Sequence, residues 1–295
     1  MLRVLRRILV VLAVTLLGGA AVIAAVSEGK LRKRYPVTAA PVSPGTDSLA
    51  LGRGAHLYRI TTCALCHAAD GGGALYSDAG PIGVVAGPNL TRGRGGIGAL
   101  RTDADLVRAI RHGVRPDSTS LMVMPSEVFA HLSDPDLAAL LGWIRRLPPV
   151  DREVPRSRFR WLGRVLLAAG RMNILVAPKT PAGAARAPVP EGPTPEYGRY
   201  LADITGCHGC HGEGLSGGTV AGPPGLPPAS NLTPTGLAGW TAESFAGVVR
   251  TGRRANRTEL HEFMPWREYR HMTDQELAAL WRYLESVPPR PFGGK

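Results

Sequence analysis

The sequence predicts an all-α protein with two tandem domains of about 100 residues each, preceded by an N-terminal membrane-anchor helix. Three features support this prediction: an internal repeat, matched helix-capping residues in both copies, and an uncharged apolar run near the N-terminus. No stretch alternates convincingly between apolar and polar residues, as a half-buried strand would. Helices joined by long glycine-rich loops are therefore expected.

Composition sets the first limits on function. The chain has 295 residues, of which 44% are hydrophobic and 20% charged, so it suits one large or two small globular domains. Its net charge of +12 comes from 31 Arg and 4 Lys. Such an excess favours acidic partners or an anionic surface, and no nucleic-acid motif accompanies it.

The second half of the chain repeats the first, which defines the domain organisation. We expect domains at residues 46–150 and 194–290, joined by residues 151–193. The matched segments are Leu57 to His67 with Leu201 to His211, Asn89-Leu90-Thr91 with Asn231-Leu232-Thr233, Arg111 and Gly113 with Arg250 and Gly252, Met124-Pro125 with Met264-Pro265, and His131 to Leu140 with His271 to Leu280.

Each copy carries start and stop signals for three helices. Hydroxyl or carboxyl side chains can accept hydrogen bonds from the free N–H groups of a first turn, and glycine or proline can end a helix. The predicted N-caps are Thr46 or Asp47, Thr102 and Ser133 in the first copy, and Thr194, Thr241 and Thr273 in the second. Glu276 can complete a capping box with Thr273. The middle helices are expected to stop at Gly113 and Gly252, and the last ones before the Pro-Pro pairs at 148 and 288.

Residues 1–34 predict an export signal or a membrane anchor. The uncharged run Ile8–Val26 is 19 residues long, which reaches the lower range of a membrane-spanning helix and exceeds the usual apolar core of a cleaved signal. Ala24, Ala25 and Ser27 form only an imperfect cleavage site. We therefore expect an uncleaved anchor at the periplasmic face of the cytoplasmic membrane; the alternative is secretion into the periplasm after cleavage.

The segment between the domains has two parts. Arg156 to Val176 places apolar residues at helical spacing beside several arginines, which is typical of a basic amphipathic helix. Such a helix can lie on a membrane, but we expect it to cover apolar surface between the two domains. Ala177 to Pro195 contains six prolines and predicts an extended, fairly stiff linker.

All four cysteines fall in two copies of Cys-x-x-Cys-His, which leaves none for a disulfide framework. Cysteines three apart on a helical turn project to one side, where they can form thioethers with the two vinyl groups of a porphyrin while the histidine faces the iron. A zinc site built from two cysteine pairs is the competing interpretation, but zinc does not require the adjacent histidine. The sequence therefore predicts two covalently bound haem c groups. Their attachment residues are Cys63, Cys66 and His67, and Cys207, Cys210 and His211.

A second axial ligand is expected from the repeated Met-Pro. Met124 and Met264 follow the motif histidines by 57 and 53 residues, and a soft thioether sulfur favours ferrous iron. A single methionine is usually a flexible core filler, but its repetition at equivalent positions favours ligation. Other candidates are Met122, His112, His131, His261 and His271. The two Asn-Leu-Thr segments fit the glycosylation pattern, and their repetition favours a loop role near the haem instead.

Together, these motifs resemble the diheme members of the class I cytochrome c family. The resemblance extends from about Thr46 to Pro289 and is closest to membrane-associated cytochrome subunits of bacterial alcohol, aldehyde and sugar-acid dehydrogenases. It implies His67 and His211 as proximal iron ligands, Met124 and Met264 as distal ligands, and a periplasmic, membrane-facing location. This chain carries two haem motifs where many of those subunits carry three.

The expected function is electron transfer, with no catalytic residue of its own. The donor would be a membrane-associated dehydrogenase or a quinol-oxidising complex, and the acceptor a further cytochrome or terminal oxidase. The alternative is a haem enzyme, such as a diheme peroxidase or a thiosulfate-oxidising cytochrome, in which one iron has an open site. The repeated Met-Pro argues against that alternative. A third possibility, a haem-based sensor, lacks a recognisable output domain.

Overall fold

The computed structural model describes residues 1–180, 186–222 and 225–294, so part of the expected linker and of the glycine-rich loop 217–225 lies outside the described residues. The elements, in chain order, are α1 (Leu2–Arg32), α2 (Ser48–Ile60), α3 (Cys63–His67), β1 (Ala74–Asp78), β2 (Gly83–Gly87), α4 (Asp103–His112), α5 (Ser126–Phe129), α6 (Asp134–Arg146), β3 (Arg158–Phe159), α7 (Trp161–Ala168), the 3₁₀ turn η1 (Ala177–Lys179), α8 (Pro195–Thr205), α9 (Cys207–His211), α10 (Ala242–Thr251), α11 (Trp266–Tyr269) and α12 (Asp274–Ser286).

Each domain is built around one close helix crossing. In the first domain α2 crosses α6, and in the second α8 crosses α12. A Cβ atom added at Gly54 would stand 2.1 Å from the Ala139 carbonyl oxygen, and one at Gly198 would stand 2.0 Å from that of Ala279. Only glycine permits this approach, because any side chain would force the helices apart. The repeat therefore reproduces the same helix packing twice.

The capping predictions are confirmed in both copies. Asp47, Thr102, Ser133, Thr194, Thr241 and Thr273 each accept a hydrogen bond from the first turn of their helix. Glu276 completes the capping box with Thr273. Gly113 and Gly252 end α4 and α10 in the left-handed conformation, with φ of 66° and 70°. These local signals explain why the helices begin and end where they do.

The chain is mostly helical, but the prediction of an all-α fold was wrong in one detail. Strands β1, β2 and β3 form a small antiparallel sheet in that order. β1 and β2 have five residues each and β3 has two, and a shift in register interrupts the first pairing. Strands this short, one of them flanked by glycines, do not contain enough residues for an alternating pattern to be visible in the sequence.

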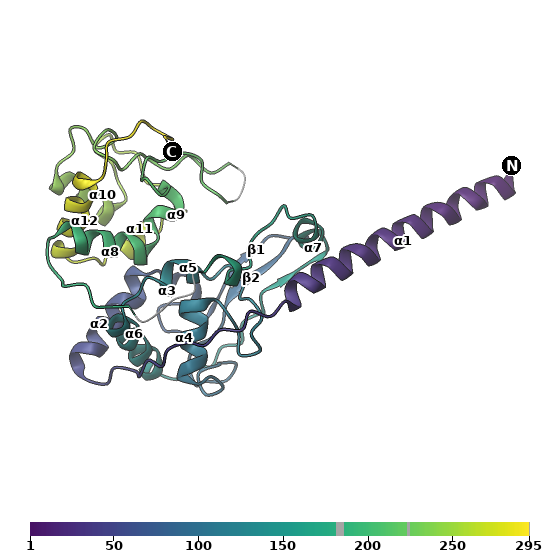
Figure 1. Cartoon of the computed structure of the whole chain (residues 1–295), viewed down its shortest axis with the longest axis horizontal. Helices are drawn as coiled ribbons and strands as arrows, with labels where there is room; N and C mark the ends of the chain where they lie inside the picture. The colour runs from purple at the N-terminus through teal and green to yellow at the C-terminus, as the bar shows by residue number, and fades with distance from the viewer. Residues whose placement is uncertain (181–185, 223–224, 295) are drawn as a thin grey trace.

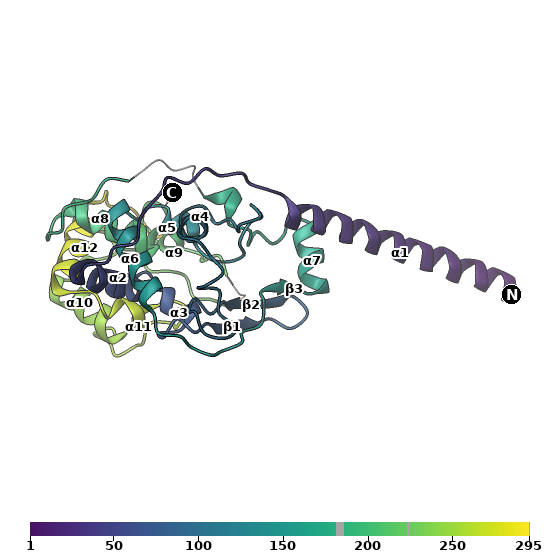
Figure 2. The same cartoon turned by 90° about the horizontal axis from the view of Figure 1, so that it is seen from below.

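The amphipathic segment also differs from the prediction. The expected helix over Arg156–Val176 is reduced to α7, because Arg158 and Phe159 pair with β2 and Gly170, with φ of 69°, follows the helix end. α7 does not lie between the two domains. It packs on α1, β2 and β3 at the side of the first domain from which α1 projects (Figures 1 and 2).

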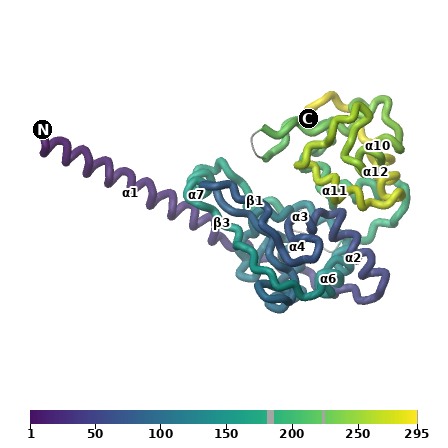
Figure 3. The backbone as a smooth tube through the Cα atoms, turned by 180° about the vertical axis from the view of Figure 1, so that it is seen from behind, coloured from purple at the N-terminus to yellow at the C-terminus, as the bar shows by residue number. Residues whose placement is uncertain are grey.

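The two domains lie side by side and share one apolar core (Figure 3). A buried polar network crosses their boundary. The Arg53 guanidinium donates to both carboxylate oxygens of Asp136 at 2.9 Å and to Glu276 at 3.2 Å. His56 Nε2 lies 2.8 Å from Glu276, and the Tyr200 hydroxyl donates to Asp136 at 2.6 Å. Satisfied buried polar groups of this kind fix the relative orientation of the domains.

Candidate haem sites

Each Cys-x-x-Cys-His motif forms a separate one-turn helix with a residue of positive φ at both ends. Thr62 and Ala68 flank α3 with φ of 62° and 61°, and Gly206 and Gly212 flank α9 with φ of 79° and 80°. The two non-glycine residues in the first copy hold a conformation that costs about 1 kcal/mol or more each. A motif held in this way presents its cysteines on one side of the turn.

The four cysteines lie in partly buried positions and form no disulfides. Burial raises the pKa of Cys63 and of Cys66 to about 11, and it also raises the pKa values of Cys207 and Cys210. Thiols with such pKa values are protonated at neutral pH, unlike the thiolate nucleophiles of redox-active Cys-x-x-Cys sites. Their environment thus suits structural attachment rather than thiol–disulfide exchange.

The two motif histidines are held in the same way. His67 Nδ1 lies 2.9 Å from the Pro88 carbonyl oxygen, and His211 Nδ1 lies 2.7 Å from that of Ser230. Because a carbonyl oxygen only accepts, Nδ1 carries the proton and Nε2 keeps its lone pair. Burial lowers the pKa of both imidazoles, which favours the neutral form that a metal requires. Both side chains therefore fit the role of an iron ligand.

The Asn-Leu-Thr segments tie the loop that follows each motif to the end of its domain. Asn89 Oδ1 accepts from the N–H and hydroxyl of Thr91, and Asn89 Nδ2 donates to the Val150 carbonyl at 2.7 Å. Asn231 makes the same bonds with Thr233 and donates to the Arg290 carbonyl at 2.8 Å. The repetition of these segments thus has a structural cause, since each directly follows, and so holds in place, the loop residue whose carbonyl pairs with the motif histidine.

A glycine near each motif allows the backbone to close this loop. Gly73 and Gly217 donate their N–H to the carbonyls of His67 and His211, both at 2.9 Å. Their φ values are 78° and 76°, and an added Cβ would stand 2.6 Å and 2.4 Å from neighbouring backbone atoms. The space beside each motif is therefore framed by backbone that tolerates no side chain there.

Met124 and Met264 occupy equivalent places in the two domains. Each directly precedes a proline that caps a four-residue helix, α5 or α11, and each is partly buried against the apolar core. The other candidates have different surroundings. Met122 forms an isolated backbone bridge with Leu175, His112 is buried at the end of α4, and His261 Nδ1 accepts from the N–H of Phe263. His271 is exposed.

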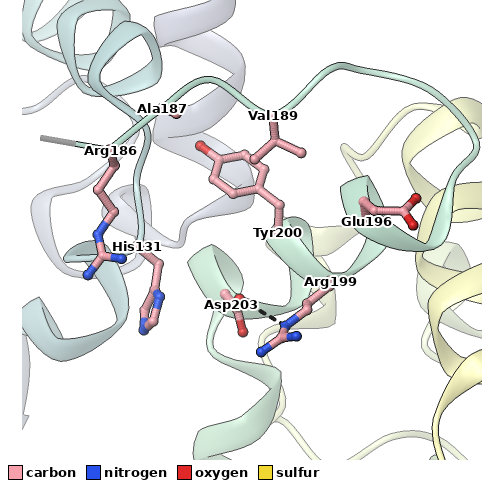
Figure 4. A pocket seen from close by; sticks show the side chains of 8 residues that line it. All are labelled: His131, Arg186, Ala187, Val189, Glu196, Arg199, Tyr200 and Asp203. Atoms are coloured by element: carbon pink, nitrogen blue, oxygen red, sulfur yellow. Dashed lines mark ion pairs between the residues drawn. The ribbon is translucent and has the colours of Figure 1, made fainter.

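His131 lines a cavity of about 380 Å³ between the linker, the first domain and α8 (Figure 4). Its other lining residues are Arg186, Ala187, Val189, Glu196, Arg199, Tyr200 and Asp203. None belongs to a Cys-x-x-Cys-His motif or to a Met-Pro pair. Arg199 and Asp203 form a long ion pair of 4.0 Å across its wall. The cavity is thus distinct from the haem motifs.

Hydroxyl contacts near the motifs could not be predicted from the sequence. Tyr58 donates to the Ala68 carbonyl at 2.8 Å, and Tyr269 donates to the Thr205 carbonyl at 2.7 Å. One tyrosine comes from α2 and the other from α11, so the repeat does not align them. Thr61 and Thr205, which are aligned, place their hydroxyls 3.3 Å and 3.5 Å from the sulfurs of Cys63 and Cys207.

Two cysteine side chains on one turn, a neutral histidine beside them and a methionine in the same domain form a donor set that fits haem c. Within the described residues, no group of three or more His, Cys, Asp or Glu side chains could hold a metal ion. This fold and these two sites define a c-type cytochrome with one haem per domain.

Comparisons with known proteins give the family. Residues 50–144 match the family model of "Cytochrome C oxidase, cbb3-type, subunit III", and residues 195–288 match that of "Cytochrome c". A "Diheme cytochrome c-type" protein of Cereibacter sphaeroides is 30% identical over 266 residues, which cover 80% of this chain and 85% of that protein. The chain belongs to the diheme c-type cytochromes, and two haem c groups are bound to it covalently.

Two further relatives are subunits of dehydrogenases. The alcohol dehydrogenase (quinone) cytochrome c subunit of Gluconacetobacter polyoxogenes is 27% identical, over 86% of this chain and 59% of that protein. The fructose dehydrogenase cytochrome subunit of Gluconobacter japonicus is 25% identical, over 88% of this chain and 57% of that protein. The chain thus spans less than two thirds of the length of these subunits.

Proposed function

We propose that this protein carries electrons between a membrane-associated dehydrogenase or quinol-oxidising complex and a further cytochrome or terminal oxidase. Cys63 and Cys66 attach one haem, and Cys207 and Cys210 attach the other. When bound, haem supplies the one-electron chemistry, and the protein supplies the ligands, the dry surroundings and the distance between the two irons. Substrate oxidation takes place on another protein.

In this proposal His67 and His211 bind iron through Nε2, because Nδ1 of each ring already donates to a backbone carbonyl. That hydrogen bond fixes the tautomer and the ring orientation and strengthens the histidine as a ligand. Met124 and Met264 would be the second protein ligands of the two irons. Histidine and methionine together would raise the reduction potential and leave no open site on the iron, which suits a carrier.

The observation that carries the proposal is the duplication of the whole surroundings of the motif, including the histidine carbonyl partner, the Asn-Leu-Thr loop and the Met-Pro turn. An enzyme such as a diheme peroxidase needs one iron with an open site, and so favours unequal sites. Here the histidine, the Asn-Leu-Thr segment and the Met-Pro pair recur at equivalent positions in both domains. Similarity to dehydrogenase cytochrome subunits supports a dehydrogenase as donor.

The oxidised-state absorption spectrum tests the ligation. The carrier predicts the weak iron–methionine charge-transfer band from both haems, and Met124→Ala and Met264→Ala should each remove about half of it. A high-spin haem in the unmodified protein would contradict the carrier and support the enzyme. Met122→Ala is the matched control, because Met122 is the neighbouring sulfur and should leave the band unchanged.

The proposed location is the periplasmic face of the cytoplasmic membrane, with α1 retained as an anchor. α1 has a mean hydropathy of 2.7 over its most apolar window and is long enough to cross a membrane. Mass spectrometry of the mature protein should find residues 1–26 in place. A mature N-terminus near Ser27 would instead show a cleaved signal. The donor should co-purify from detergent-solubilised membranes.

A further inference from the structure

The positive charge of the chain is concentrated outside the haem domains. Residues 1–45 contain seven basic and one acidic side chain, and residues 151–193 contain eight basic and three acidic. The two domains are close to neutral, with ten basic against nine acidic side chains in residues 46–150 and nine against ten in residues 194–290. Nearly all of the net +12 therefore belongs to the N-terminal segment and the connector.

These two basic segments meet where α1 joins the globular body. Lys30 Nζ donates to the carbonyls of Leu167 and Ala168 at 2.8 Å and 3.2 Å, and so caps the C-terminal end of α7. Arg164 forms a 2.9 Å ion pair with Glu28, and Ser27 is fully buried beneath α7. The junction is thus a packed contact, which fixes α7 against the base of α1.

The contact lies at the end of the apolar run. At 1.5 Å per residue, Ile8–Val26 extends for about 28 Å, close to the thickness of a bilayer's hydrocarbon core. The first residues after it, Ser27 and Glu28, are those that α7 covers. α7 also runs across α1: the length of α1 is seen in both Figures 1 and 2, while α7 is seen nearly end-on in Figure 1 and from its side in Figure 2. With α1 in the membrane, α7 lies in the headgroup layer, roughly parallel to the bilayer.

α7 exposes one large apolar side chain, that of Trp161, while Val165 and Ala168 are half-buried. Gly163 and Leu167 are its buried residues, and a Cβ added at Gly163 would stand 2.0 Å from the Ile82 carbonyl oxygen at the hairpin tip. Trp161, Val165 and Ala168 lie on the opposite side at helical spacing, and the Trp161 side chain is 68% exposed. Tryptophan prefers the interface between lipid and water, where its ring contacts acyl chains and its N–H meets headgroups.

We propose that the junction of α1 with residues 156–171 is a docking surface for the headgroups of anionic phospholipids. Trp161 lies among the lipids, and the exposed Arg156, Arg158 and Arg171 contact phosphate groups around it. The inference rests on the proposed retention of α1 as an anchor. It adds that the first domain is held in one orientation on the membrane instead of rotating about a single helix.

The experiment places a nitroxide label at residue 161 of the full-length holoprotein. Because haem attachment occupies the native cysteines, Trp161→Cys carries the accessible thiol for labelling. The protein is reconstituted into vesicles of phosphatidylcholine and phosphatidylglycerol, and power-saturation EPR compares collisions with oxygen, which enters lipid, and with a water-soluble nickel complex. We expect loss of nickel collisions at residue 161. Leu49→Cys, whose native side chain is 85% exposed on α2, is the control and should keep them.

The outcomes separate the surface from the anchor. If the protein floats with the vesicles while the label at residue 161 collides freely with nickel, the proposed lipid-docking surface is refuted and the proposed anchor α1 is supported. If the protein does not float with the vesicles, both are wrong. Lipid contact at residue 161 supports both.

A charge reversal tests whether lipid contact at residue 161 depends on attraction between the arginines and anionic headgroups. In the labelled protein, Arg156→Glu combined with Arg158→Glu should restore nickel collisions in vesicles that contain phosphatidylglycerol. Arg92→Glu combined with Arg94→Glu makes the same charge change at exposed positions of the first domain and should not. Equal behaviour of the two double variants, or of vesicles with and without phosphatidylglycerol, would overturn the role of anionic lipid.

Discussion

The two domains are alike around their haem motifs and differ in the outer parts. Both hold the histidine by a backbone carbonyl, close the loop with an asparagine, and cross two helices over a glycine. Only the first has the β-sheet, packs against α7 and lies beside α1, within the part of the chain that the structure describes. The two copies are therefore alike where the cofactor is bound and differ where the first domain contacts α1 and α7.

The largest expected effect is the loss of haem and of folding in one domain while the other domain keeps both. Cys63→Ala combined with Cys66→Ala removes covalent attachment of the first haem, and Cys207→Ala combined with Cys210→Ala removes the second. Haem supplies much of the buried apolar surface in domains this small, so the affected domain should not fold. Pyridine haemochrome analysis should give one haem per chain instead of two, and far-UV circular dichroism should show lost helix. A fully helical, haem-free domain would contradict this expectation.

A second effect should differ between the copies. Arg111 is 2% exposed and donates to Asp134 and to the Leu132 carbonyl, whereas its equivalent Arg250 pairs with the almost fully exposed Asp274. Removing a buried partner leaves polar groups unsatisfied, so Arg111→Ala should lower the free energy of unfolding by about 3 kcal/mol. Arg250→Ala should lower it by less than about 1 kcal/mol. Urea titrations measure both, and equal losses would show that burial does not distinguish the two pairs.

A third effect should be the same in both copies. Asn89 and Asn231 each connect the loop after the motif to the end of the domain through side-chain hydrogen bonds. Replacement by alanine leaves a backbone carbonyl and a threonine hydroxyl without their partner, at a cost of about 2 kcal/mol in either domain. Urea unfolding of Asn89→Ala and Asn231→Ala checks this. A marked inequality would mean that the two loops are not equivalent.

Features encoded within one or two helical turns could be predicted from the sequence. The starts of three helices could be predicted from the N-caps Thr102, Ser133 and Thr273, because capping depends on residues three positions apart. The Cys-x-x-Cys-His spacing predicts haem for the same reason, because attachment needs one turn of helix. In contrast, α7 is shorter than its apolar pattern, since pairing of residues 158–159 with β2 takes the first part of that pattern into a strand.

Contacts between distant segments could not be predicted. Arg53 and His56 on α2 meet Glu276 on α12, more than 200 positions away, and no local pattern connects them. Glu276 was expected only as part of a capping box, a role that it also fills. Comparison of the two copies does not reveal the contacts of Tyr58 and Tyr269, because the two residues lie on non-equivalent helices. The partners of Glu276 depend on how the two domains pack together, and those of the two tyrosines on how helices pack within each domain.

The smallest expected effect concerns that shared boundary and depends on pH. Burial alone would raise the pKa of Glu276, but the hydrogen bond with His56 and the positive charge of Arg53 hold it below its ordinary value of 4.5. A lowered carboxyl pKa means that the ionised form stabilises the fold above pH 4.5, and that this stabilisation is lost as the pH falls through the lowered value. Acid should therefore weaken the boundary between the domains before it releases haem, whose attachment is covalent.

Glu276→Gln isolates this contribution, since it keeps the shape of the side chain and removes its charge. The free energy of unfolding should fall less steeply in the variant than in the unmodified protein between about pH 5 and pH 3, because the variant has no carboxylate to protonate at that position. Glu213→Gln, at an exposed site, is the control and should follow the unmodified protein. Parallel curves for Glu276→Gln and the unmodified protein would mean that the Arg53–Glu276–His56 contact does not couple the domains, and that the shared apolar core alone holds them together.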